Sequence, residues 1–126
     1  MPPGPYDIGP ARPRRDALPK ACGTERFSAD LYPPDLLWAG AKRAGIPHGL
    51  VRGIDAALAR SLPGVQAVLT RADVPGSNRQ GIVHKDMPVL CGSKVRHEGA
   101  PVALVVADSR DLLRRALALV RVALDP

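Results

Sequence analysis

The segment with the most suggestive spacing for chemistry is Gly76–Gly81 (GSNRQG), which carries the two glycines of a phosphate-binding loop. In such a loop the second glycine is followed by Lys and by Ser or Thr, which contact phosphate and magnesium. Here Ile82 and Val83 occupy those two positions, and no apolar strand leads straight into the segment. The pattern therefore predicts a surface loop.

Potential metal ligands are also too few. His84 and Asp86 offer an imidazole and a carboxylate, while His48 and His97 stand at no recognisable ligand spacing from them. A structural or catalytic metal centre needs three or four protein ligands. We therefore expect each histidine to be exposed or hydrogen-bonded, and we predict no metal-binding residue.

The nucleophilic side chains lack partners in sequence. Cys22 and Cys91 form no C-x-x-C pair, neither has a basic neighbour that would activate it, and the serines lie in no G-x-S-x-G elbow. We expect two reduced thiols in the cytoplasm, with one long-range disulfide as the alternative. The sequence thus predicts no catalytic and no cofactor-binding residue.

Composition indicates a small globular protein. The chain has 126 residues, 45% of them hydrophobic, and a net charge of +6. Domains of this size are the common case, and no apolar stretch approaches the ~20 residues of a membrane span, so we expect one domain and no membrane partner. Basic residues are scattered and aromatic residues make up 3%. We therefore expect no nucleic-acid partner, although a basic nucleic-acid binder, whose affinity falls steeply with salt, stays an alternative.

Two regions differ in composition. Met1–Arg14 contains five prolines and two glycines, which predicts an extended, mobile arm. From Arg15 onward the pattern is globular, and it predicts a sheet with two helices. The expected strands are Leu36–Ala44, Leu50–Ile54, Val65–Thr70, Val102–Ala107 and Val120–Leu124; the expected helices are Ala56–Leu62 and Arg110–Leu119.

Details of the two helices follow from their ends and faces. Asp55 is predicted to accept amides at the start of the first helix, where Leu58 and Leu62 share one face. Asp108 or Ser109 is predicted to cap the second helix. Its predicted apolar stripe comprises Leu112, Leu113, Ala116, Leu117 and Val120. Val102–Ala107 is apolar on both faces, which predicts a strand covered on both sides. The fold class is α+β or α/β with one mixed sheet.

Several short stretches together resemble one family, in order and across Arg15–Leu124. They look like the opening of the molybdenum-cofactor large subunit of xanthine dehydrogenases and aldehyde oxidases. The matching stretches are Arg15–Lys20, Cys22-Gly23, Phe27–Asp30, Ile54-Asp55, Leu62–Val65, Ala67–Thr70, Ala72–Gly76, Asn78, Gly81, Pro88–Leu90, Lys94-Val95, Gly99 and Pro101–Asp108.

The resemblance implies that residues 15–126 form the N-terminal α/β hammerhead domain of that family, an α+β unit with a mixed sheet and two helices. Family members hydroxylate aldehydes or N-heterocycles with a molybdopterin-bound molybdenum and pass electrons to iron–sulfur clusters. The implied partners are therefore a molybdenum-cofactor-binding catalytic domain or chain and an iron–sulfur domain or subunit. A freestanding interaction module that reuses the fold is the alternative.

Two departures from the family pattern matter. Cys22 stands where the family usually carries a small hydroxyl residue, so that turn is expected to lose a side-chain hydrogen bond. The cofactor segments and the catalytic glutamate of the family belong to a part that would follow Pro126, so no residue here inherits those roles. Two isolated cysteines also cannot supply the four thiolates that an iron–sulfur cluster requires.

The segment Gly76–Pro88 is predicted to be a contact surface for such a partner. It interleaves basic and apolar residues over a greater length than a simple connection needs. The residues expected at the interface are Asn78, Arg79, Gln80, His84 and Lys85. Ile82 and Val83 would bury against the partner. In the alternative interpretation, Ile82 and Val83 cover this domain's own core.

The resemblance generates a first prediction. We expect the purified chain to contain no molybdenum and to hydroxylate neither aldehydes nor purines, because the resemblance assigns the cofactor-binding segments to other parts of the enzyme. Elemental analysis and an activity assay check this, and stoichiometric molybdenum in the pure chain would show the prediction to be wrong.

Overall fold

A computed structural model describes residues 13–126, which fall into two compact units divided between Pro34 and Asp35. Most of the predicted arm Met1–Arg14 lies outside the described residues. The predicted domain start at Arg15 stays a prediction. Among the described residues, no helix is both long and apolar enough to cross a bilayer.

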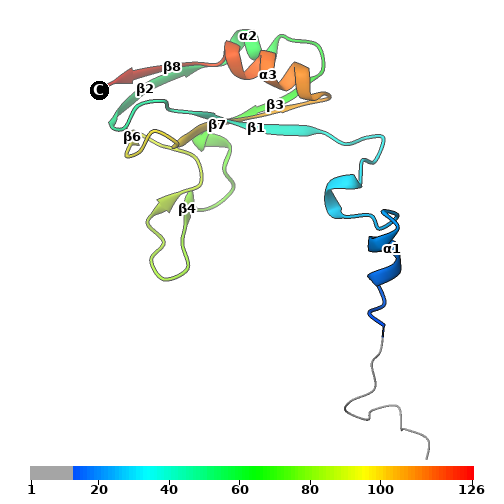
Figure 1. Ribbon diagram of the computed structural model, residues 1–126. Helices are drawn as coiled ribbons and strands as arrows, with labels where there is room; N and C mark the ends of the chain where they lie inside the picture. Colours follow the sequence, from blue (N-terminus) through cyan, green and yellow to red (C-terminus); the bar gives the residue numbers. More distant parts are fainter. Residues whose placement is uncertain (1–12) are drawn as a thin grey trace, which may run out of the picture. The chain divides into compact units, whose positions relative to one another are not determined.

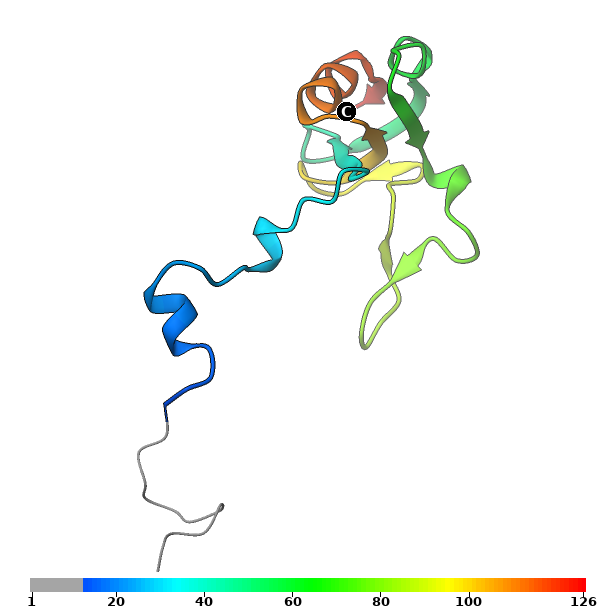
Figure 2. The same ribbon diagram turned by 90° about the vertical axis from the view of Figure 1, so that its right-hand side faces the viewer.

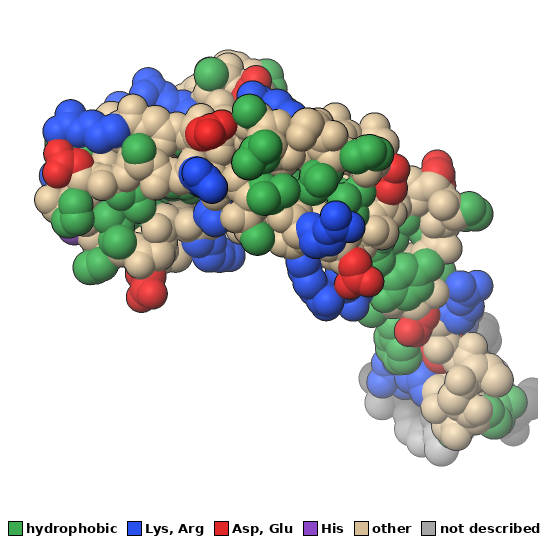
Figure 3. All heavy atoms as spheres, turned by 90° about the horizontal axis from the view of Figure 1, so that it is seen from above, with side chains coloured by type: hydrophobic (Ala, Val, Ile, Leu, Met, Phe, Trp, Pro, Cys, Tyr) green, Lys and Arg blue, Asp and Glu red, His purple; other side chains and the backbone are tan. Residues whose placement is uncertain are grey.

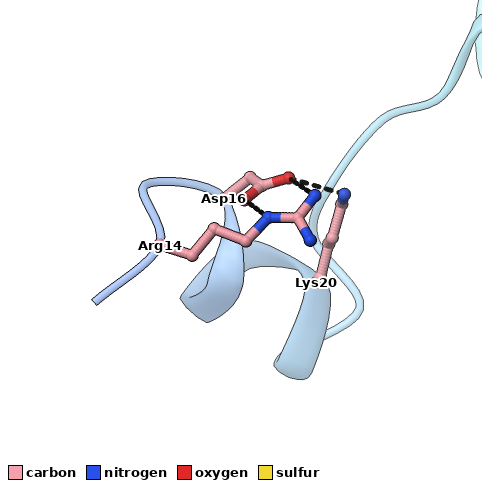
Figure 4. A network of polar contacts seen from close by, with 3 residues as sticks. All are labelled: Arg14, Asp16 and Lys20. Carbon is pink, nitrogen blue, oxygen red and sulfur yellow. Dashed lines mark hydrogen bonds and ion pairs between the residues drawn. The ribbon is translucent and has the colours of Figure 1, made fainter. Parts of the chain in front are cut away.

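The first unit contains a short helix, α1 (Ala17–Ala21), and a 3-10 turn, η1 (Ser28–Asp30). An ion-pair network surrounds the start of α1 (Figure 4): Asp16 binds Lys20 at 2.6 Å and Arg14 at 2.6 Å. The hydrogen bond from Lys20, followed by that from Arg14, lowers the pKa of Asp16. From residue 13 to Pro34 no side chain is buried.

The second unit contains three small sheets, and every strand pair in them is antiparallel. The first sheet has the order β1 (Trp38–Arg43), β7 (Pro101–Ala107), β3 (Val65–Leu69); the second has the order β6 (Lys94–Val95), β2 (Gly49–Asp55), β8 (Arg121–Asp125). The third pairs β4 (Arg79–Gln80) with β5 (Met87–Pro88). Two helices, α2 (Ala57–Arg60) and α3 (Arg110–Leu119), and a 3-10 turn, η2 (Arg71–Asp73), complete the unit.

The α+β class is confirmed, but the single mixed sheet is wrong. Each helix connects strands of different sheets: α2 follows β2 and leads to β3, and α3 follows β7 and leads to β8. A parallel pair would need a crossover that returns to the same sheet. Neither helix makes such a crossover, and every strand pair of the described residues is antiparallel.

The composition of the central strand β7 predicts burial on both faces; the structure buries one face fully and the other only in part, with Leu104 and Val106 half-buried. Ala103, Val105 and Ala107 belong to a core cluster that α3 covers, whereas Val102 belongs to a second cluster with Val95. Each of these residues is fully buried. Because successive side chains of a strand point to opposite faces, Val102 and Ala103 lie in different clusters, and β7 joins the two halves of the core.

Helix α3 lies close against the first sheet because of Gly40 in β1. A Cβ at this position would lie 3.1 Å from the Leu117 side chain and 3.2 Å from that of Leu113. Glycine is unfavourable inside a strand, but at this position it makes room for the helix. At the start of α3, Leu112 donates its backbone N–H to the Ser109 hydroxyl at 3.2 Å, which decides between the two predicted caps.

Helix α2 differs from its prediction. It covers only Ala57–Arg60, and its buried residue is Ala59. Leu58 is 53% exposed, so the predicted face of Leu58 and Leu62 is wrong. Asp55 does accept a hydrogen bond from the backbone N–H of Ala57, at 3.0 Å. A helix of one turn has no room for an i,i+4 face, and here the small side chain packs inward.

Within the second unit, α2 and α3 lie on one side of the strands, while the β4–β5 hairpin projects from the opposite side (Figures 1 and 2). On the face that carries the two helices, basic, acidic and apolar side chains are interspersed (Figure 3).

Limited digestion with thermolysin, which cleaves before large apolar residues, tests where the protected core begins. We expect the first cuts before Phe27 or Leu31 and before Ile82, because these side chains are exposed. Apolar bonds within β7 should resist, because cleavage requires local unfolding. Mass spectrometry identifies the fragments. Early cleavage in β7 would contradict the core assignment, and cuts confined to residues 1–14 would support a domain that starts at Arg15.

Candidate partner interface

The segment predicted as a contact surface folds as a β-hairpin. The strands β4 and β5 pair through Arg79 with Pro88 and Gln80 with Met87. The sequence shows no strand period here because each strand has only two residues. At the turn, Gly81 has φ +148°, and a Cβ there would overlap the carbonyl oxygen of His84. A glycine is therefore required at the point where the chain reverses.

The base of the hairpin is held by the side chain of Asn78. Its Nδ2 donates to the carbonyl oxygen of Leu90 at 2.7 Å, and its Oδ1 accepts from the Leu90 backbone N–H at 3.0 Å. Both groups are partly buried. Asn78, predicted to hydrogen-bond to a partner, thus has an internal role that joins the two sides of the hairpin.

The tip of the hairpin exposes large apolar side chains. Ile82 is fully exposed, and Val83 is 83% exposed. The alternative interpretation, in which these two residues cover the domain's own core, is therefore wrong. Single exposed apolar residues are ordinary on protein surfaces, but two adjacent ones at the tip of a projecting hairpin form a contact element that the domain itself does not use.

Four other residues of the predicted interface lie on the same hairpin. Arg79, Gln80, His84 and Lys85 are all exposed. Within residues 13–126, none of their side chains forms a hydrogen bond or an ion pair. The hairpin therefore brings together an apolar tip and polar groups that are available to a partner.

A basic cavity of ≈ 540 Å³ lies at the base of the hairpin, and sequence reasoning missed it. Arg71, Lys94 and Arg96 line it together with Arg79, and Asp86 is the acidic residue in the lining. These cations come from η2, β4 and the region of β6, so no local sequence pattern groups them. The scattered basic residues of the sequence gather here only through the fold.

The buried thiol near this cavity has a structural role. Cys91 is 2% exposed, and its Sγ donates to the carbonyl oxygen of Lys94 at 3.1 Å. Burial raises the pKa of the Cys91 thiol, and the positive charge of Arg96 opposes this shift. Cys22 is exposed, Cys91 is buried, and both are free thiols in the structure. Residues 13–126 contain no group of three or more His, Cys, Asp or Glu side chains that could hold a metal ion.

A comparison with protein-family models matches residues 22–126 to the aldehyde oxidase and xanthine dehydrogenase a/b hammerhead domain. The chain belongs to this family. The hammerhead fold expected from the sequence resemblance is thereby confirmed. The match includes the hairpin, the basic cavity and both core clusters of the second unit.

Relatives in this family are much longer proteins. The hammerhead domain is 42% identical to the nicotinate dehydrogenase large molybdopterin subunit of Eubacterium barkeri, over 87% of this chain and 26% of that protein. It is 39% identical to a probable xanthine dehydrogenase subunit of Bacillus subtilis, over 90% of this chain and 15% of that protein. The chain therefore spans about a quarter or less of the length of these relatives.

Solved structures show the same backbone. Superposition on the aldehyde oxidoreductase from Desulfovibrio gigas gives a TM-score of 0.80 at 37% identity, and covers 90% of this chain and 14% of that one. For the CO dehydrogenase from Oligotropha carboxidovorans the TM-score is 0.82 at 31% identity, over 91% of this chain and 15% of that one. In both cases the hammerhead domain corresponds to a small part of a much larger chain.

The internal role of Asn78 can be separated from a role at an interface. In Asn78→Ala, the Leu90 amide loses its acceptor, so we expect its hydrogen exchange to accelerate at least about fivefold, as the loss of ~1 kcal/mol would produce. The matched control is Gln80→Ala, whose exposed side chain should leave exchange at Leu90 unchanged. Equal exchange rates in the two variants would contradict the structural role of Asn78.

Proposed function

We propose that this chain is a structural, non-catalytic hammerhead region of a molybdenum-cofactor hydroxylase of the xanthine dehydrogenase and aldehyde oxidase type. The observation that carries the proposal is the β4–β5 hairpin: its apolar tip is exposed, and within residues 13–126 the side chains of Arg79, Gln80, His84 and Lys85 form no hydrogen bond or ion pair. Its partners are a molybdenum-cofactor-binding catalytic domain or chain and an iron–sulfur domain or subunit. The assembly is cytoplasmic.

The name and length of one relative support a proposal in which other domains or chains carry out the hydroxylation. The nicotinate dehydrogenase relative is by name a large molybdopterin subunit, and this chain corresponds to 26% of it. Three quarters of such a protein is thus left to hold a cofactor and a substrate pocket. In this proposal the hammerhead region shapes and supports that remainder, and the hydroxylation of an aldehyde or N-heterocycle takes place there.

The donor groups of this chain do not fit the cofactors of the assembly. An iron–sulfur cluster requires four thiolates, and the two cysteines are separated, one exposed and one buried. The described residues also bring together no set of metal ligands. In this proposal the chain carries no catalytic step, and its part is to position and to bind.

The apolar tip of the hairpin is the contact that should matter most for binding. Burying a large apolar side chain at the centre of an interface contributes ~1.5–3 kcal/mol. Ile82 and Val83 belong to neither core cluster of the domain and are exposed. Arg79 and Lys85 would lie around this apolar contact, where charges affect the choice of partner and the rate of association more than affinity.

The proposal is tested by co-expressing the tagged chain with the molybdenum-cofactor-binding region of the same enzyme, produced as a separate polypeptide. We expect the two to co-purify with molybdenum, and Ile82→Ser/Val83→Ser to weaken the complex at least about tenfold. Arg79→Glu/Lys85→Glu should also weaken it. Thermal unfolding of both variants should stay within ~0.5 kcal/mol of the wild type, because the altered side chains are exposed.

Leu58→Ser is the matched control, because Leu58 is an exposed leucine on α2, on the side of the strands opposite to the hairpin. It should leave binding unchanged. Unchanged binding in both hairpin variants would contradict the interface. A wild-type chain that binds a protein without molybdenum would instead support a freestanding interaction module, the alternative interpretation of the same hairpin.

A further inference from the structure

The basic cavity at the base of the hairpin has walls from three segments of the second unit. Arg71 comes from η2, Arg79 and Asp86 come from the hairpin, and Lys94 and Arg96 come from the region of β6. Its volume of ≈ 540 Å³ lies in the ~300–1,000 Å³ range of pockets that hold medium-sized ligands. It is therefore large enough for several side chains of another protein.

The charge in the lining is unbalanced. Four cationic side chains face one carboxylate, and within residues 13–126 none of the four forms an ion pair. On the helix-bearing face, by contrast, basic and acidic side chains are interspersed (Figure 3). A concave surface lined by one sign of charge concentrates its field, and it attracts groups of the opposite sign.

Local interactions hold the walls in place. A Cβ at Gly92 would lie 3.1 Å from both Cδ and Nη1 of Arg71, so the glycine makes room for that side chain. The turn that carries Arg71 is fixed by Asp73, whose carboxylate accepts from the backbone N–H of Thr70 at 2.7 Å and from its hydroxyl at 3.0 Å. On the opposite side, Asn78 holds the hairpin to Leu90. The cations are thus presented on fixed backbone.

We propose that this cavity binds an acidic segment of the protein partner, with Asp or Glu side chains placed against Arg71, Arg79, Lys94 and Arg96. The inference rests on the proposed function in one respect, because the same partner would cover the hairpin. It adds the chemistry that this partner must present: carboxylates at the base of the hairpin and an apolar pocket at its tip.

A protein segment fits better than a free anion. All four cations are exposed, and ion pairs of exposed cations with a small anion in water are weak. A partner that seats on Ile82 and Val83 would also cover the cavity and exclude water from it. Ion pairs in such a covered site are stronger, because the effective dielectric constant falls. The apolar tip and the basic cavity therefore favour the same occupant.

The full chain, labelled with ¹⁵N, can be titrated with an N-acetylated, C-amidated hexaglutamate peptide and separately with inorganic pyrophosphate. We expect saturable shifts of the amides of Arg71 and of residues 92–96 with the peptide. Arg71→Glu/Arg96→Glu should weaken this binding at least about tenfold. Pyrophosphate that saturates the same amides more tightly than the peptide would overturn the proposal in favour of a small-anion site.

The matched control, Arg115→Glu/Arg121→Glu, makes the same change in net charge at exposed positions on α3 and β8. It should weaken peptide binding less than about twofold, and equal losses in both double variants would overturn the proposal. If the first variant unfolds, Arg71→Gln/Arg96→Gln is compared with Arg115→Gln/Arg121→Gln in the same way.

The co-expression assay separates the two hypotheses. If the wild-type chain co-purifies with the molybdenum-binding polypeptide, and the Arg71→Glu/Arg96→Glu and Arg115→Glu/Arg121→Glu variants do so equally well, the proposed function stands and the acidic-segment inference fails. If the wild type does not co-purify, the proposed function fails, while selective peptide binding at Arg71 and residues 92–96 would still support the inference.

Discussion

The burial of β7, complete at Val102, Ala103, Val105 and Ala107, is the constraint on which the rest of the second unit depends. This strand pairs with β1 on one edge and with β3 on the other, so its backbone groups are satisfied without water. It contributes Ala103, Val105 and Ala107 to one core cluster and Val102 to the other, and its side chains are valines and alanines, with one leucine, after the initial proline. The small residues allow α3 to lie close, and no polar residue could replace them without an unpaired buried group.

The local elements follow from sequence because their signals are local. The uniform apolar run of Val102–Ala107 and the 3.6-residue stripe of Arg110–Leu119 each reflect burial of the element itself. The arrangement of the sheets does not follow in the same way. Whether a crossover helix returns the chain to the same sheet depends on the packing of α2 and α3 against strands that are distant in sequence. For the same reason, the sequence shows Gly40 as a residue that is unfavourable in a strand. It does not show that α3 packs so close that a side chain at this position would not fit.

In the candidate interface, too, features with a local sequence signal could be predicted, and features that depend on distant segments could not. The composition of Gly76–Pro88 indicates a contact segment, and the tip residues Ile82 and Val83 are exposed as that interpretation requires. The basic cavity could not be predicted, because Arg71 lies on a separate turn from Lys94 and Arg96. The internal role of Asn78 was also hidden, since an asparagine beside a glycine-rich loop is more typical of an exposed turn.

The hairpin can serve a partner because the fold does not need it for its core. The buried residues of both clusters lie in or beside the two larger sheets and the helices, and none belongs to the segment from Gly76 to Met87. Residues at the tip can therefore change with little effect on the stability of the domain. Asn78 and Gly81 are the exceptions, because one fixes the base of the hairpin and the other its turn. In this domain, stability depends on β7, while the chemistry offered to a partner lies on an element that projects from the opposite side to the helices.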